Sequence, residues 1–432
     1  DDVESRGLGD VYKRQILDFL VEKGIHPYIE MGFKAKEVFQ NVHKRLVDVD
    51  NKNQMRIIEK NKGFLEELIR HLVKRYGMEE VETWYIELEK NSVIRSNVEP
   101  EKYFDTFEII YGIFKTYVPG IHIGGAGFSL NDPGENLQEI LVKWKKRKVQ
   151  PDFISLYSYP YIIDKKIIDA GRSAYAPDRD YLRNQIEETR RCMNEVQMDA
   201  ELHVTEWSNS LSNRNVLNDS CFKGAYVMKN LIQNCQKADV IGYWLASDLF
   251  SDYYDTKKIL YGGCGLLTKD GIRKPSYYAF KFMNALGGQC IGKNENAVAT
   301  RSGSKQISIC CHNYKHFNFR YYLVEEDEIE VERQAGMFED NERLQMTVRL
   351  KNVEEGTYQI KIYSVNQEFG NIQNEWEKIG YYNDLNLEEM EYLKSVTQPK
   401  IYLRQQKSVK GILEIETVLG AQEIQNIIVT EI

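Results

Sequence analysis

The residues best suited to chemistry lie at the end of one short apolar stretch. Leu202 and Val204 alternate with polar residues and predict a buried strand, with Glu206 at its carboxyl end and Trp207 next in the chain. An ionised carboxylate is costly to bury unless a partner stabilises it, so Glu206 is a candidate reacting group. Trp207 would give the adjoining pocket an aromatic wall for a sugar ring. The alternative is a glutamate that merely ends a strand and faces water.

Several further motifs occur in the order found in one enzyme family. Thr-Glu-Trp at 205–207 is followed by Asp219, Tyr-Trp-x-x-Ser-Asp at 243–248, Gly-Gly-x-Gly-Leu at 262–266 and Lys-Pro at 274–275. From about residue 16 to its C-terminus, the chain resembles the family 39 glycoside hydrolases, the β-xylosidase and α-iduronidase group. The resemblance implies a retaining glycosidase on a (β/α)8 TIM barrel, with Glu206 as nucleophile. It implies neither a cofactor nor a metal.

The same resemblance identifies a departure at the second catalytic position. The family's fourth strand reads Trp-x-Phe-Glu-x-Trp-Asn-Glu-Pro, where the Asn orients the sugar 2-hydroxyl and the following Glu is the general acid/base. This chain keeps Trp84 and Glu87 but has Glu89, Lys90, Asn91 and Ser92 at the last four positions. Asn91 therefore stands at the acid/base position. An amide has no proton to donate to a leaving-group oxygen, so hydrolysis is expected to be impaired or lost.

Two nearby carboxylates are possible replacements for the missing acid. Side chains alternate along a strand, so Glu87, Glu89 and Asn91 share one side. Glu89 lies one pleat, roughly 6–7 Å, before the usual acid position and is a candidate substitute acid. Glu87 is interpreted as a structural carboxylate low in the barrel, paired with a buried cation.

The remaining predicted contacts with sugar come from the carboxyl ends of other strands. Tyr157 replaces a histidine that the family usually has on its sixth strand. Residues 240–248 are predicted to form the eighth barrel strand. Trp244 on this stretch is either a platform under a sugar ring or apolar filling of the barrel. In the family, a glutamate in the loop after this strand contacts sugar. The corresponding loop of this chain, at 249–258, is acidic and Tyr-rich, and Asp252 is the residue nearest to that glutamate's position in the sequence. The predicted substrate-binding residues are Lys90, Tyr157, Trp207, Tyr243, Trp244 and Asp252.

The elements that must position these residues divide the chain into three parts. Residues 1–15 have no sustained period and are interpreted as a non-native or disordered leader. Residues 16–290 correspond to the TIM barrel, in which the family's first two strands are apparently missing, and six strands alone cannot close. Residues 291–432 alternate at period two and predict a C-terminal β-sandwich, with a structural role as the default.

Composition narrows the class of partner. The net charge of −8 argues against a nucleic-acid contact by this segment, and the 28 Tyr and 5 Trp suit carbohydrate binding. Seven Cys at irregular spacing, and no apolar run near 18 residues, favour a cytoplasmic protein without disulfides or membrane contact. The expected ligand is a pentose sugar or xylo-oligosaccharide, and the oligomeric state is not predicted.

Two functions follow. One is a β-xylosidase-like domain with impaired hydrolysis. The other is a non-catalytic sugar-sensing domain, because such domains resemble the C-terminal parts of some AraC-type transcription regulators.

Overall fold

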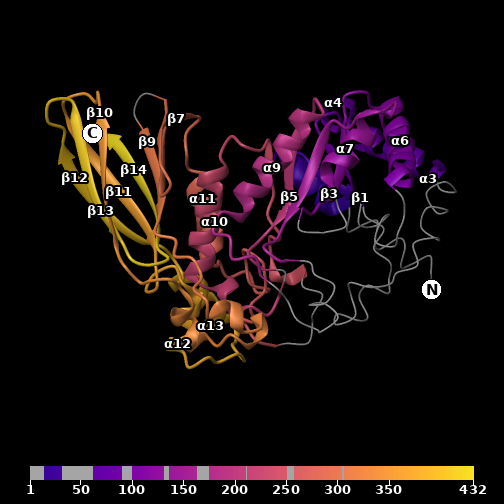
Figure 1. Cartoon of the computed structure of the whole chain (residues 1–432). Helices are drawn as coiled ribbons and strands as arrows, with labels where there is room; N and C mark the ends of the chain where they lie inside the picture. Colours follow the sequence, from indigo (N-terminus) through magenta and orange to yellow (C-terminus); the bar gives the residue numbers. More distant parts are fainter. Residues whose placement is uncertain are drawn as a thin grey trace. The chain divides into compact units, whose positions relative to one another are not determined.

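The computed structural model describes eight segments of the chain (Figure 1). They are residues 14–31, 62–89, 100–130, 136–162, 175–210, 212–250, 257–303 and 306–432. Contacts divide the chain into two compact units. The first comprises Asp1–Tyr157, Ile186–Thr205 and Ala238–Val240, and the second comprises Ser158–Gln185, Glu206–Lys237 and Ile241–Ile432. The predicted leader lies almost wholly outside the described residues, and the predicted domain boundary at residue 290 stays a prediction.

A six-stranded sheet runs in sequence order, as the barrel prediction requires. Its strands are β1 (Tyr28–Met31), β2 (Tyr85–Glu89), β3 (His122–Phe128), β4 (Phe153–Ser158), β5 (Glu201–Trp207) and β6 (Val240–Ile241). The pairs β1–β2, β2–β3 and β3–β4 are parallel, with Glu30 opposite Glu87 and Glu87 opposite Gly124. Parallel neighbours need a crossover between them, which explains the helices that separate the strands in sequence.

The helices follow the predicted alternation. They are α3 (Lys62–Tyr76), α4 (Met78–Val81), α6 (Pro100–Tyr117), α7 (Leu137–Lys145), α9 (Tyr181–Glu195), α10 (Cys221–Asn234) and α11 (Pro275–Met283). In α7, the Asn136 side chain accepts from the Glu139 backbone N–H and caps the helix. Pro275 occupies the first turn of α11, where its missing N–H has no helical partner to lose.

One strand prediction was too long. Residues 240–248 read as the eighth barrel strand, but β6 ends at Ile241. Beyond it, the backbone of Leu245 and Ala246 accepts hydrogen bonds from Leu266 and Leu267, at 3.0 and 3.1 Å. Asp248 in turn donates its backbone N–H to the Leu267 carbonyl at 2.9 Å. The segment therefore pairs with a later loop rather than with β5.

The C-terminal part of the second unit is antiparallel, which confirms the predicted β domain. Its six-stranded sheet has the order β12-β11-β14-β9-β8-β7, and a second sheet pairs β10 with β13. The bounds are β7 (Gln289–Lys293), β8 (Ala297–Ser302), β9 (Gln306–His312), β10 (Leu344–Lys351), β11 (Thr357–Val365), β12 (Lys400–Lys407), β13 (Ile412–Leu419) and β14 (Ile424–Glu431). Fully buried Ile309, Ile360, Leu413 and Ile427 share one apolar core.

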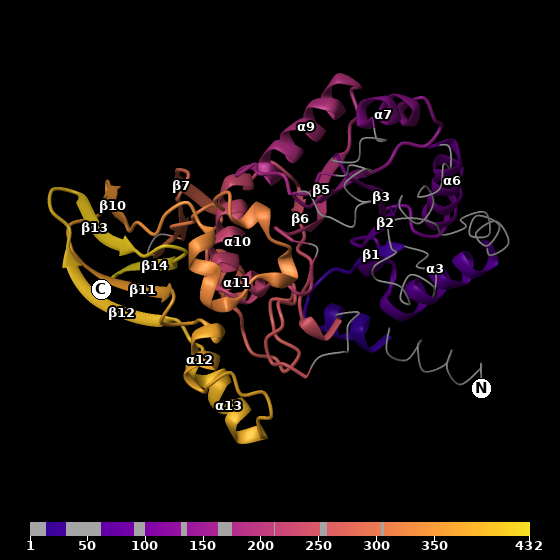
Figure 2. The same cartoon turned by 60° about the horizontal axis from the view of Figure 1, so that its bottom comes forward.

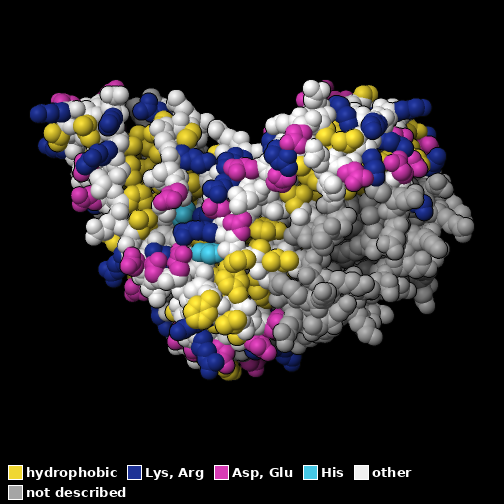
Figure 3. All heavy atoms as spheres, in the orientation of Figure 1, with side chains coloured by type: hydrophobic (Ala, Val, Ile, Leu, Met, Phe, Trp, Pro, Cys, Tyr) yellow, Lys and Arg dark blue, Asp and Glu magenta, His cyan; other side chains and the backbone are white. Residues whose placement is uncertain are grey.

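Two short helices, α12 (Ile372–Lys378) and α13 (Leu387–Val396), lie side by side (Figure 2). Asn386 and Glu389 form a reciprocal capping box at the start of α13, which explains why this helix could be read from sequence. Within the described ranges, none of the helices combines the length and apolarity needed to cross a membrane. On the described part of the face in Figure 3, basic and acidic side chains are interspersed.

Candidate active site

Glu206 lies at the carboxyl end of β5, where its side chain is half-buried. The Tyr159 hydroxyl donates a hydrogen bond to Glu206 Oε2 at 3.2 Å. Burial, with the Glu206 charge beside it, holds the pKa of Tyr159 well above its usual range, so this hydroxyl stays a donor at any physiological pH. Sequence reasoning missed Tyr159, although it stands two residues after Tyr157 and at the end of the same strand.

The two tryptophans of the predicted site lie in different surroundings. Trp207 is fully buried. Its ring packs edge-on against Tyr243, with centroids 5.3 Å apart, and lies tilted against Tyr226 at 5.8 Å. Trp244 is 36% exposed. Trp207 is therefore packed among aromatic rings, whereas half-buried Tyr243 and the more exposed Trp244 keep surface that a ligand can reach.

The predicted residues of the first unit lie on β2 and β4. Glu87 is buried, and the Thr205 hydroxyl on β5 donates to Glu87 Oε1 at 3.1 Å. Glu89 is half-buried and ends β2. The ring of Tyr157 lies so close to Gly127 that a Cβ there would approach it to 2.6 Å, and the backbone φ of Gly127 is +65°. The contact between the Tyr157 ring and the backbone of β3 thus explains why a glycine stands at position 127.

Three predicted site residues, Lys90, Asn91 and Asp252, lie outside the described residues. The acid/base reading at Asn91 and the sugar contacts assigned to Lys90 and Asp252 therefore remain predictions. Within the described ranges, no group of three His, Cys, Asp or Glu side chains is arranged to hold a metal ion.

A buried lysine supports the turn that follows the Glu206 strand. Lys223 Nζ donates to Ser208 Oγ and Asn209 Oδ1, both at 2.5 Å, and to Asn218 Oδ1 at 3.0 Å. Lys223 is 0% exposed, and burial lowers its pKa to about 8. Nothing in the local sequence distinguishes this lysine from a solvated one, because its oxygen partners come together only in the fold.

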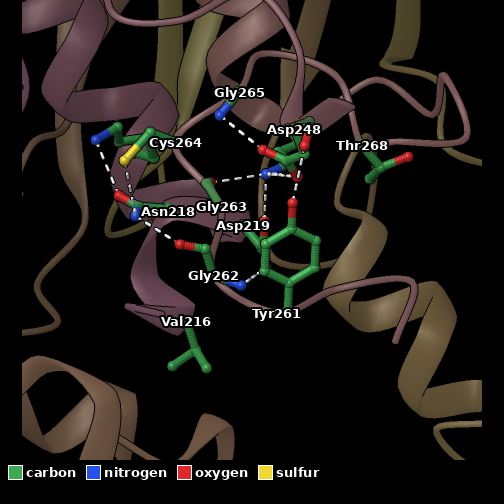
Figure 4. Close-up of polar contacts among 12 residues, drawn as sticks. Val216, Asn218, Asp219, Asp248, Tyr261, Gly262, Gly263, Cys264, Gly265 and Thr268 are labelled. Carbon is green, nitrogen blue, oxygen red and sulfur yellow. Dashed lines mark hydrogen bonds and ion pairs between the residues drawn. The ribbon is translucent and has the colours of Figure 1, made fainter. Parts of the chain in front are cut away.

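The other motifs meet at a second buried lysine, Lys274, whose partners Asp219, Asp248 and Gly263 are labelled in Figure 4. Lys274 Nζ lies 2.6 Å from Asp219 Oδ1 and 2.6 Å from Asp248 Oδ2, and it donates to the Gly263 carbonyl at 2.9 Å. All three charged side chains are buried. Burial opposes the charge of Lys274, but the two carboxylates together raise its pKa above the usual range. Burial, opposed by Lys274, raises the pKa of Asp219 to about 6.

The glycine motif wraps around this cluster. Asp219 Oδ2 accepts from the Gly262 backbone N–H at 2.8 Å, and Asp248 Oδ1 accepts from Gly265 at 2.7 Å. Gly262 has a φ of +83°, and an added Cβ on Gly265 would lie 2.3 Å from the Asp248 nitrogen. Side chains are therefore excluded because the loop lies directly against the ion cluster.

Comparison with known proteins places this geometry in context. Residues 11–414 match the family model described as "Glycosyl hydrolases family 39". A β-xylosidase of Geobacillus stearothermophilus is 26% identical over 423 residues, which cover 96% of this chain and 79% of that protein. A β-xylosidase of Caldicellulosiruptor saccharolyticus is 27% identical over 280 residues, 64% of this chain and 56% of that protein. An HTH-type transcriptional regulator of Staphylococcus aureus is 23% identical over 200 residues, 46% of this chain and 25% of that protein.

Solved structures show the same fold. A monomeric β-xylosidase from Caulobacter crescentus CB15 superimposes with a TM-score of 0.77 at 22% identity, over 96% of this chain and 83% of that one. A GH39 enzyme from Xanthomonas axonopodis pv. citri gives a TM-score of 0.77 at 21% identity, over 96% and 81% of the two chains.

Proposed function

Because the chain belongs to glycosyl hydrolase family 39, we propose that it binds a pentose-type sugar or a short xylo-oligosaccharide. We assign Glu206 as the nucleophile of a retaining site in which Asn91 has replaced the general acid/base. The observation that carries the assignment of Glu206 is the hydrogen bond from Tyr159 at 3.2 Å. It holds a half-buried carboxylate in place at the carboxyl end of a barrel strand, where reacting groups of this fold lie.

The chemistry proposed for Glu206 has two steps. In the first, a carboxylate oxygen attacks the anomeric carbon, the glycosidic bond breaks, and the leaving-group oxygen takes a proton. In the second, water hydrolyses the glycosyl-enzyme with the help of a general base. Tyr159 donates to Oε2 of Glu206 at 3.2 Å and so orients the carboxylate for the attack.

Asn91 affects both steps, because an amide supplies neither the acid nor the base. A well-placed proton donor typically contributes about 10²–10⁴-fold to the rate. Cleavage is therefore expected only for substrates with good leaving groups, and the second step is expected to limit turnover. Glu89, the half-buried carboxylate that ends β2, is the alternative acid.

The sugar platform is assigned to Trp244. A stacking residue must present a ring face to the ligand, and Trp244 is 36% exposed whereas Trp207 is 0% exposed. Trp207 then acts as a packed ring that supports the end of β5, and half-buried Tyr243 stays a candidate for contact with sugar.

The function is tested with an activated aryl β-xyloside, with and without azide. Azide attacks a glycosyl-enzyme without needing a general base, so it should raise turnover and give a β-xylosyl azide of retained configuration. Asn91→Glu should raise turnover in the absence of azide, and Asn91→Gln is the matched control that should not. Rapid cleavage without azide that is lost in Glu89→Gln would move the acid role to Glu89.

The second candidate is a sugar-sensing domain without turnover. It is favoured by the match of 46% of the chain to HTH-type transcriptional regulators, together with the amide at position 91. Calorimetry with xylose and xylobiose distinguishes the two candidates. Saturable binding without any cleavage, azide-dependent or not, supports the sensor.

A further inference from the structure

Three charged residues that the proposed chemistry does not use, Asp219, Asp248 and Lys274, form one buried cluster, of which Figure 4 labels the two aspartates. Asp219 ends a 3-10 turn (Val216–Asp219) in the loop that follows Glu206. Asp248 ends the segment that carries Trp244, and Lys274 directly precedes α11. The Lys274 ammonium lies 2.6 Å from a carboxylate oxygen of each aspartate and so joins the two.

The cluster is connected to Trp244 by an unbroken series of backbone hydrogen bonds. Lys274 donates its backbone N–H to Leu266 O at 3.0 Å, and Leu266 donates to Leu245 O at 3.0 Å. Leu245 follows Trp244 directly in the chain. On the other side, Asp248 is fixed by Gly265 N–H at 2.7 Å and by the Lys274 ammonium at 2.6 Å.

The carboxylates cannot be exchanged for amides without a clash of donors. Asp248 Oδ1 accepts a hydrogen bond from the Gly265 N–H, and Oδ2 forms an ion pair with Lys274 Nζ, so a positive or donor group faces each oxygen. In Asp248→Asn, either orientation of the amide turns its NH₂ group toward one of these donors. An amide of the same shape therefore cannot reproduce both contacts of the carboxylate.

We propose that Lys274, with Asp219 and Asp248, is a positioning device that fixes the Trp244 segment against the loop that follows Glu206. The inference rests on the proposed function only in the use it gives to Trp244. The cluster touches no substrate. Its role is to hold the platform tryptophan and the nucleophile's loop on one buried ion, while the Gly262–Gly265 turn closes over it.

The test moves the cluster without removing its charges. Gly263→Ala places a Cβ 2.4 Å from Asp248 Oδ1 and so pushes that carboxylate off Lys274. Gly288→Ala is the matched control, because a Cβ there meets nothing within 4 Å. Asp248→Asn is the second variant, and circular dichroism selects the samples that remain folded.

Two readouts separate this inference from the proposed function. The first readout needs no sugar and is the quenching of tryptophan fluorescence by acrylamide. The contribution of Trp244 is obtained by subtracting the signal of the same variant that also carries Trp244→Phe. We expect quenching to change at least about twofold in Gly263→Ala and Asp248→Asn, and to be unchanged in Gly288→Ala. The second is xylobiose affinity, expected to fall about fivefold to tenfold, the worth of one aromatic stack.

The outcomes are distinct. Folded variants whose Trp244 quenching matches the wild type overturn the positioning role. Changed quenching with unchanged xylobiose affinity supports the positioning role and removes Trp244 from the sugar site. Changed quenching with no xylobiose binding even in the wild type supports positioning and contradicts the proposed function.

Discussion

Replacing Lys223 by methionine should remove about 2 kcal/mol of the free energy of unfolding that the wild type gains between about pH 7 and about pH 9.5. Lys223 is buried, and its ammonium is held by three neutral oxygens, of Ser208, Asn209 and Asn218. Neutral acceptors only partly replace water, so burial lowers the pKa from 10.5 to about 8. The folded protein therefore releases this proton at a lower pH than the unfolded chain does.

The sign and size follow from linkage. Between the folded pKa of about 8 and the unfolded value of 10.5, the unfolded state binds more protons, so the free energy of unfolding rises with pH. Integrated from about pH 7 to about pH 9.5, one such group adds about 2 kcal/mol. Lys223→Met has no ammonium at this position and loses this gain.

Urea unfolding at the two pH values, at one ionic strength, measures the effect. The free energy of unfolding of the wild type, minus that of Lys223→Met, should be about 2 kcal/mol larger at the higher pH. Lys281→Met, at an exposed position of α11, is the control and should show no such change. A difference that stays constant between the two pH values would refute the reasoning, because Lys223 would then titrate as it does in water.

Three further results are expected. Tyr159→Phe removes the donor to Glu206, a hydrogen bond to a charged group worth about 1.5–3 kcal/mol, so covalent labelling of Glu206 should slow about 10–100-fold; unchanged labelling kinetics would contradict the orienting role. Gly127→Ala should lower the free energy of unfolding by about 1–3 kcal/mol in urea, because the new Cβ meets the Tyr157 ring at a positive φ; wild-type stability would show that the ring is free to move. Asn91→Glu should raise aryl β-xyloside turnover about 10²–10⁴-fold, and no gain would place the lesion elsewhere in the site.

The alternating strands and helices and the β domain could be predicted because their signals are local, whereas the barrel itself was expected from the family resemblance. Alternating strands and helices, and then a period of two, are visible within windows of about ten residues. The prediction of a strand over 240–248 was too long. The apolar residues of this stretch suit a strand, but its backbone pairs with residues 266–267. Which partner a segment chooses depends on contacts distant in sequence, and no local pattern records it.

The candidate site divides in the same way. Glu206 was predicted from its position at a strand end, and Tyr159 could have been predicted from its place at the end of the neighbouring strand. Trp207 was expected to line a pocket, but the structure buries it against Tyr243 and Tyr226, because an aromatic at a strand end can pack inward as readily as outward. The role of Lys274 required the fold itself, since its two carboxylates lie 55 and 26 residues earlier in the chain.

The most direct test of the assignment of Glu206 is covalent trapping by an activated 2-deoxy-2-fluoroxyloside, read by intact mass and peptide mapping. Its leaving group departs without a proton, so the amide at position 91 does not prevent the first step. One adduct per chain on Glu206, absent from Glu206→Gln, is the predicted result. An adduct that persists in Glu206→Gln, or none in a wild-type protein that binds xylobiose, would contradict the assignment of the nucleophile.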